Sequence, residues 1–239
     1  MSNEDVVVKP ARSRAAKFGR GVLYTFAVLF VLGFVAKTVW KYSGSNRWEL
    51  VAENKKKRVR VYVLKSPGTE LEQTRAIAPM KSSLAGLVKF MQDPDVCNDV
   101  GCDHSRTIER VDDQLQFTTF RFPYPGPFRP RELITRAHFS QNPNTKEVLL
   151  EYAATPDLLP PDPCCYRVTR MNNTWRFRPI GNGEVEVEVL MNMDEGGFLP
   201  DVLSNLARRK VLLGALPGIA KLVAKPKYQE AKFDFIKEQ

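Results

Sequence analysis

The longest apolar stretch of the chain covers residues 21–40 (GVLYTFAVLFVLGFVAKTVW) and follows a polar leader. As a helix, its uncharged part at residues 21–36 reaches roughly 24 Å, and the whole stretch reaches the thickness of a hydrocarbon core, about 30 Å. Lys37 can extend its ammonium to the interface, where Trp40 is also favoured. Small residues suitable for cleavage are poorly placed near its end. We therefore expect an uncleaved transmembrane anchor, with a cleaved export signal and a buried soluble helix as the alternatives.

Charges on either side of this anchor set the expected topology. Five Lys or Arg lie in residues 1–20, and five more lie within twenty residues after the apolar run, so the preference of cations for the inside is nearly balanced. A short leader with five cations is nevertheless hard to translocate. We expect a single-pass protein with the leader (1–20) in the cytoplasm, a linker at 41–45 and an exported domain, which in a bacterium lies in the periplasm.

Beyond the linker, alternating apolar and polar positions predict a domain rich in strands. Strands are expected at residues 58–64, 71–78, 105–111, 115–122, 132–140, 146–154 and 184–193. Helices are expected at residues 47–53, then after a cap at Ser82 or Ser83, and finally from Pro200 onward with a break at Gly214 and Pro217. This order predicts an α+β fold, with one domain at residues 46–224 and a charged tail at 225–239 that contacts the membrane or packs on the domain.

The clearest strand, residues 184–193, predicts a hydrophobic site. Its outer row opens with glutamates, and its inward row is Val185, Val187, Val189, Met191 and Met193. Methionine adapts to an irregular space, so this row suits a cavity as well as an ordinary core. The closing helix offers a matching apolar stripe with Leu203 and Leu206, followed by three cations at residues 208–210 that we expect in solvent. These valines, methionines and leucines are the candidate lining of the site.

Charge and motifs narrow the possible functions. Of the formal net charge of +9, residues 1–45 carry +5, so the cationic excess lies mainly at the membrane segment and gives nucleic-acid binding little support. The sequence has no glycine-rich phosphate loop, nucleophile elbow or HExxH motif. Of the two histidines, His104 is expected in solvent and His138 on the outer face beside a carboxylate. Arg121 and Arg136 are candidates for orienting a ligand headgroup, with surface ion pairs as the alternative.

The four cysteines allow more than one arrangement. Cys97 and Cys102 can form a disulfide that closes a small loop if the domain is exported. A zinc site with His104 is the alternative, although the spacing is poor and a fourth ligand is missing. Cys164 and Cys165 are adjacent, so we expect at least one of them to be a free or buried thiol.

Several segments of the domain also resemble a known family. They are residues 46–50 (NRWEL), 122–128 (FPYPGPF) with the following Arg131-Glu132, 175–179 (WRFRP), 184–189 (EVEVEV) and 194–200 (DEGGFLP). In order and spacing, over residues 46–224, they resemble a StAR-related lipid-transfer (START) domain. The likeness is greatest to exported bacterial members, in which two cysteines flank the segment after the first long helix, as Cys97 and Cys102 do. The resemblance implies a helix-grip fold, with a curved antiparallel sheet around a long C-terminal helix, that encloses one hydrophobic molecule.

The sequence thus predicts a membrane-tethered, non-catalytic domain that binds, and is a candidate for transferring, a lipid or sterol-like molecule. It predicts no cofactor and no metal. Two alternatives stay open: an enzyme of the wider helix-grip superfamily, such as a hydrolase or cyclase that uses His138, and an envelope interaction module with a filled core.

Overall fold

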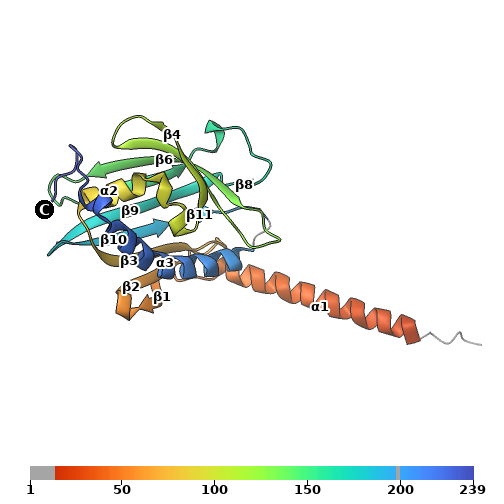
Figure 1. Ribbon diagram of the computed structural model, residues 1–239. Coiled ribbons are helices and arrows are strands. Elements are labelled where there is room, and N and C mark those ends of the chain that lie inside the picture. Colours follow the sequence, from red (N-terminus) through yellow and green to blue (C-terminus); the bar gives the residue numbers. More distant parts are fainter. Residues whose placement is uncertain (1–13, 198–199) are drawn as a thin grey trace, which may run out of the picture.

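The computed structural model describes residues 14–197 and 200–239. Helix α1 (Arg14–Tyr42) extends away from the folded domain and is exposed along most of its length (Figure 1). Its segment Phe18–Tyr42 is long and apolar enough to cross a membrane. The predicted apolar helix is therefore present, and a span and an export signal both remain compatible with it.

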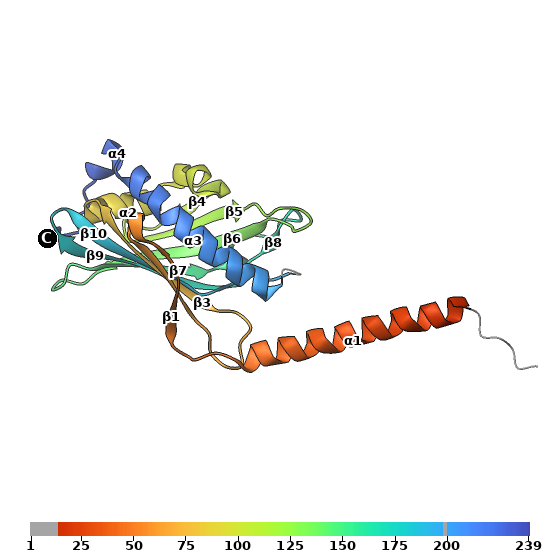
Figure 2. The same ribbon diagram turned by 90° about the horizontal axis from the view of Figure 1, so that it is seen from below.

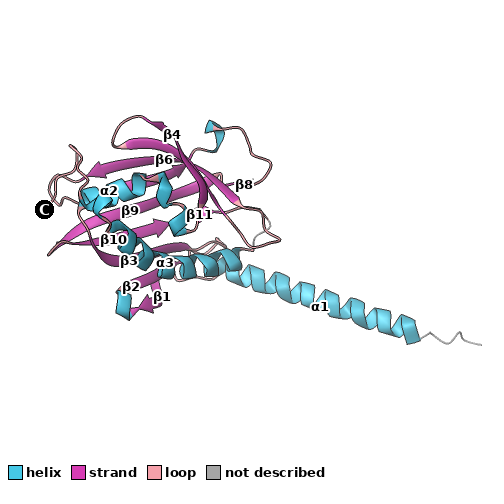
Figure 3. Ribbon diagram, in the orientation of Figure 1, coloured by secondary structure: helices cyan, strands magenta, loops and turns pink. Residues whose placement is uncertain are grey.

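The domain is built on one large, curved sheet, drawn in magenta in Figure 3. Its strands are β1 (Trp48–Asn54), β2 (Val59–Leu64), β3 (Gln73–Lys81), β4 (Asp103–Arg110), β5 (Leu115–Phe122), β6 (Arg131–Gln141), β7 (Val148–Ala154), β8 (Tyr166–Arg167), β9 (Arg170–Gly181), β10 (Glu184–Met191) and β11 (Met193–Asp194). The order is β1-β2-β3-β10-β9-β7-β6-β5-β4, with β11 beside β9 and β8 beside β6. Only the β6–β8 pair is parallel among the described strands.

Helices cover the concave face of this sheet. They are α2 (Leu84–Gln92), α3 (Asp201–Val223) and the short α4 (Pro226–Gln229), and the sheet curves around α3 (Figure 2). Of the two predicted caps, Ser83 is the one that caps α2, because its Oγ accepts a hydrogen bond from the Gly86 amide at 3.0 Å. The α+β class and the helix-grip arrangement are both confirmed.

The hairpin of β9 and β10 places the predicted glutamate row on the outer face of the sheet. Glu186 and Glu188 lie opposite Arg178 and Arg176, and the Arg178 guanidinium is 2.9 Å from the Glu186 carboxylate on the outer face. The inward valines, by contrast, are almost fully buried. Alternation in the sequence therefore decided which side of each strand faces the core.

Three local expectations are wrong. Residues 47–53 are not a helix, because β1 pairs with β2 and pairing between strands outweighs a weak local preference. Helix α3 is not interrupted at Gly214 or Pro217, since the buried side chains of Leu216 and Ile219 hold the turns around them against the sheet and α2. Cys164 and Cys165 are disulfide-bonded to each other, so neither is a free thiol. Two adjacent cysteines can close a small ring together, as Cys164 and Cys165 do.

The charged tail packs on the domain. Tyr228 and Ile236 are buried, and the Glu238 carboxylate accepts hydrogen bonds from the Leu84 and Ala85 amides at 3.0 and 2.9 Å. At the other end of α2, Lys227 lies 2.8 Å from Asp93. The tail thus crosses α2 and holds both of its ends.

Candidate functional site: an apolar cavity beneath the helices

A cavity of about 190 Å³ lies between the concave face of the sheet and the C-terminal end of α2. Strands β5, β7 and β9 form its floor, and the turns that follow α2 form one side. Most lining side chains are apolar, and they include Phe90, Phe120, Trp175 and Ile219. Such a space, largely apolar with a few polar groups, is the usual form of a small-molecule site.

The predicted inward row divides between solid core and cavity. Val185, Val187 and Val189 belong to the close-packed core, and Met191 and Met193 line the cavity. The valine end faces α2 and the C-terminal half of α3, whose side chains fill the space. The methionines therefore remain candidate ligand contacts, and the valines support the wall behind them.

Leu203 and Leu206 do not line this cavity, and this correction concerns the orientation of α3. Their exposed fractions are 47% and 51%, whereas Ser204, Asn205 and Arg208 on the same half of the helix are buried. The predicted solvation of Arg208 is therefore also wrong. The physical reason is that the first half of α3 packs on polar backbone and carboxylates, so its polar face is the one that turns inward.

Arg208 is the centre of that polar contact. Its guanidinium donates to the Glu72 carbonyl at 2.9 Å and to the Met193 carbonyl at 3.1 Å, and it lies 3.5 Å from the Glu195 carboxylate. Glu195 also accepts a hydrogen bond from Ser204 Oγ at 2.9 Å. Burial, together with the charge of Glu195, raises the pKa of Tyr124 nearby. The network fixes the start of α3 to β3 and to the loop after β11.

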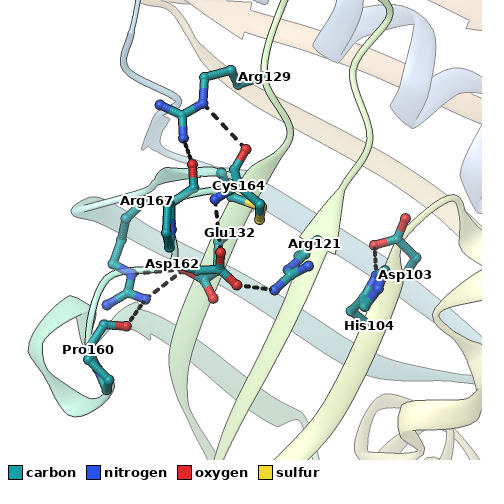
Figure 4. A network of polar contacts seen from close by, with 11 residues as sticks. Asp103, His104, Arg121, Arg129, Glu132, Pro160, Asp162, Cys164 and Arg167 are labelled. Carbon is teal, nitrogen blue, oxygen red and sulfur yellow. Dashed lines mark hydrogen bonds and ion pairs between the residues drawn. A yellow bond between two sulfur atoms is a disulfide. The ribbon is translucent and has the colours of Figure 1, made fainter.

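The two candidate arginines lie outside the cavity. Arg121 forms an ion pair with Asp162 at 2.5 Å, as Figure 4 shows, and Arg136 is exposed. The surface alternative is therefore the correct one for Arg121. In the same view, Arg167 contacts Glu132 at 2.6 Å and donates to the Pro160 carbonyl at 2.8 Å, so it tethers the proline-rich loop.

The histidines are also remote from the cavity. His138 Nδ1 lies 3.8 Å from Glu151, on the outer side as predicted, and His104 contacts Asp103 at the surface. The cavity lining contains neither of them. His138 is therefore not placed to act on a molecule held in this cavity.

Several polar side chains of the cavity were missed by the sequence analysis, among them Gln92, Gln116, Tyr152 and Asn173. These four side chains are mostly buried. The Tyr152 hydroxyl donates to the Met91 carbonyl at 3.2 Å. Burial raises the pKa of Tyr152, so its hydroxyl is neutral at physiological pH. For Gln116, Tyr152 and Asn173, only their inward parity on the strands could have indicated them, whereas Gln92 is the last residue of α2.

The disulfide between Cys97 and Cys102 also forms part of the cavity wall. It braces the turns between α2 and β4, where 3₁₀ helices cover Pro94–Val96 and Asn98–Val100. Among the residues that the structure describes, no group of three or more His, Cys, Asp or Glu is placed to hold a metal ion.

Comparison with solved structures shows which known proteins share this architecture. A STAR-related lipid transfer protein from Xanthomonas axonopodis matches with a TM-score of 0.68 and 20% sequence identity, over 74% of this chain and 99% of that one. The chain has the START fold. Human STARD10 matches with a TM-score of 0.65 at 15% identity, over 78% of this chain and 76% of its own. Human StAR-related lipid transfer protein 5 matches with a TM-score of 0.60 at 14% identity, over 83% and 97%.

Comparison of sequences gives less information about this chain than comparison of structures. No family model matches the chain. An uncharacterized protein of Pseudomonas aeruginosa is 20% identical over 168 residues, which is 70% of this chain and 83% of the relative. The resemblance read from the segments at residues 46–50, 122–128 and 194–200 is thus confirmed at the level of the START fold.

Proposed function

We propose that this protein is a membrane-tethered START-type carrier that binds a lipid or another hydrophobic molecule in the cavity beneath α2 and α3, and does so without catalysis. The observation that carries the proposal is the cavity itself, a largely apolar space of about 190 Å³ beside the main hydrophobic core. Removal of apolar ligand surface from water supplies the affinity. The fold, shared with proteins described as lipid-transfer proteins, supports the same conclusion.

The size of the cavity constrains how a ligand enters. Pockets for drug-sized ligands hold roughly 300–1,000 Å³, and this cavity is smaller. A lipid therefore fits only if lining side chains move aside. Met91, Met191 and Met193 are unbranched and flexible, and they line the space.

The contact between α1 and the domain supports a retained anchor. Trp40 Nε1 donates to the Glu70 carbonyl at 3.1 Å, and the Lys65 ammonium donates to the Lys41 carbonyl at 3.4 Å. Burial lowers the pKa of Lys65, whose side chain also lies over the Trp40 ring. Cleavage after α1 would leave this buried ammonium with fewer partners, which is costly. The anchor is therefore proposed to stay attached, with the domain exported into an oxidising compartment that suits the Cys97–Cys102 disulfide.

The outer face of α3 supports a position close to the bilayer. Val202, Leu203 and Leu206 are exposed at the end of α3 that lies beside the base of α1 (Figures 1 and 2). With the anchor in a membrane, this apolar face adjoins the headgroups, and the tether keeps the effective concentration of membrane lipid high.

Lipid analysis of the purified full-length protein tests the proposal. Wild type is expected to co-purify with, or accept, a hydrophobic ligand detected by native mass spectrometry after release from nanodiscs. Met191→Trp places a bulky indole ring in the cavity and should reduce ligand occupancy at least roughly tenfold. Val211→Trp adds the same indole ring at another exposed position of α3 and should leave occupancy unchanged. A wild-type protein that never carries any hydrophobic molecule contradicts the proposed function.

A further inference from the structure

We infer that the ligand of this cavity is uncharged and presents oxygen acceptors to two fixed amide donors, those of Gln116 and Asn173. The inference rests on the proposed function and specifies the chemistry of its ligand. It follows from one row of side chains that crosses the sheet. Gln116 pairs with Ala137, Ala137 with Tyr152 and Tyr152 with Asn173, so all four lie on one line and face the helices.

The orientation of the Gln116 carboxamide is set by an arginine on the neighbouring strand β4. Arg110, directly opposite on β4, donates to Gln116 Oε1 at 3.1 Å. A guanidinium has donors only, so the atom that it contacts must be the amide oxygen. The Gln116 NH₂ group is then the end left for the cavity, and no described residue accepts a hydrogen bond from it. The residue is only 2% exposed, so this donor has little access to bulk water.

At the other end of the row, a hydrogen bond likewise sets the orientation of the Asn173 carboxamide. The chain leaves β10 at Asn192, and the Asn192 backbone amide donates to Asn173 Oδ1 at 2.8 Å. A backbone N–H can only donate, so the oxygen of Asn173 is again identified without ambiguity. Its NH₂ group has no acceptor among the described residues, and the residue is 8% exposed and lines the cavity.

Gln116, Tyr152 and Asn173 all line the cavity, so one ligand can reach the polar groups of the row. Ala137 has the smallest side chain of the row, between Gln116 and Tyr152. Adjacent strands are about 4.8 Å apart, so the row spans roughly 14 Å along the sheet, and less across its concave side. The Tyr152 hydroxyl already donates to the Met91 carbonyl, so its oxygen is free to accept. A ligand with carbonyl, ester or hydroxyl oxygens satisfies these groups along its length.

Ionised headgroups are disfavoured, because the described lining of the cavity offers no charged side chain to pair with them. Among the cavity-lining residues that the structure describes, Asp93 is the one that is ionised at neutral pH, and it is committed to Lys227 and Tyr228 at 2.8 and 2.7 Å. Within the described part of the chain, no Lys or Arg lines the cavity, and the Arg110 guanidinium lies outside the lining, where it donates to Gln116 Oε1. Burying a carboxylate or phosphate without a cation is much more costly than burying an ester of similar size. The cavity therefore favours neutral ketones, esters, quinones and alcohols over fatty acids and phospholipids.

Three probes with the same chain length test this inference: decane, methyl decanoate and decanoate. Radiolabelled probe is measured on full-length protein in nanodiscs, with probe retained by empty nanodiscs subtracted. Methyl decanoate is expected to bind at least roughly fivefold more tightly than decane, the effect of one or two hydrogen bonds, and more tightly than decanoate at neutral pH. Gln116→Leu and Asn173→Leu should each weaken ester binding roughly threefold to tenfold while leaving decane binding intact.

The matched control is Asn172→Leu, because Asn172 is adjacent on β9 but exposed on the opposite face. It should change none of the three affinities. If the ester and decane bind equally, or if decanoate binds best, the inference about ligand chemistry is overturned while the proposed function stands. If none of the probes binds and no lipid co-purifies, the proposed function itself fails.

Discussion

Replacement of Arg208 tests how the first half of α3 is held on the domain. The Arg208→Met variant keeps a side chain of similar length and removes the guanidinium. In the wild type this group satisfies two backbone carbonyls and lies beside Glu195, and the side chains of Arg208 and Glu195 are 3% and 7% exposed. Without it, the Glu195 carboxylate remains buried with hydroxyl donors alone, such as Ser204 Oγ at 2.9 Å. Removing one partner of a buried ion pair costs about 3–5 kcal/mol, so we expect a loss of that size in the free energy of unfolding.

The assay is urea unfolding of the full-length protein in mild detergent, followed by near-ultraviolet circular dichroism. Lys210→Met, two residues further on the exposed face, is the matched control and should change stability by less than about 0.5 kcal/mol. The double variant Arg208→Met/Glu195→Gln removes the stranded charge as well, so it should be more stable than Arg208→Met alone. A loss below about 1 kcal/mol for Arg208→Met, or no recovery in the double variant, would refute the reasoning.

Three further predictions concern the ends of α2 and the disulfide beside it. Glu238→Ala removes the acceptor of two amides at the start of α2 and should cost about 1 kcal/mol in the same urea assay; an unchanged midpoint would contradict this role. Partial burial raises the pKa of Asp93, but hydrogen bonds from Lys227 and Tyr228 outweigh it, so the net pKa lies below the ordinary value. Its contribution to stability is therefore present above about pH 4 and is lost as pH falls through the lower folded-state pKa. In acid unfolding, Asp93→Asn should accordingly show a smaller loss of stability below pH 4 than wild type, and equal losses would refute the assignment. The double variant Cys97→Ser/Cys102→Ser opens a loop with a sequence separation of 5 and should cost about 2 kcal/mol; reducing the wild type should lower its stability to that of the variant, and a larger drop would point to Cys164–Cys165.

Local pattern in the sequence was sufficient for much of the fold. The alternation in residues 184–193 correctly predicted both the strand and its inward valines, because side chains on a strand alternate between two faces whatever it pairs with. The start of α2 was recognisable from a cap at Ser82 or Ser83, since capping depends only on the next few residues, and the structure has Ser83. The apolar helix at the N-terminus followed from composition and length alone.

The site depended on contacts that no local pattern contains. Whether Met191 and Met193 face a cavity while Val187 meets solid core depends on which helix lies above each residue. Gln116 and Asn173 come from strands separated by β6 and β7, and only the register of the sheet places them in one row. The polar face of α3 turns inward because the buried carbonyls of Glu72 and Met193 and the Glu195 carboxylate pair with Arg208. Periodicity determines which residues share a face, and tertiary packing decides what that face meets.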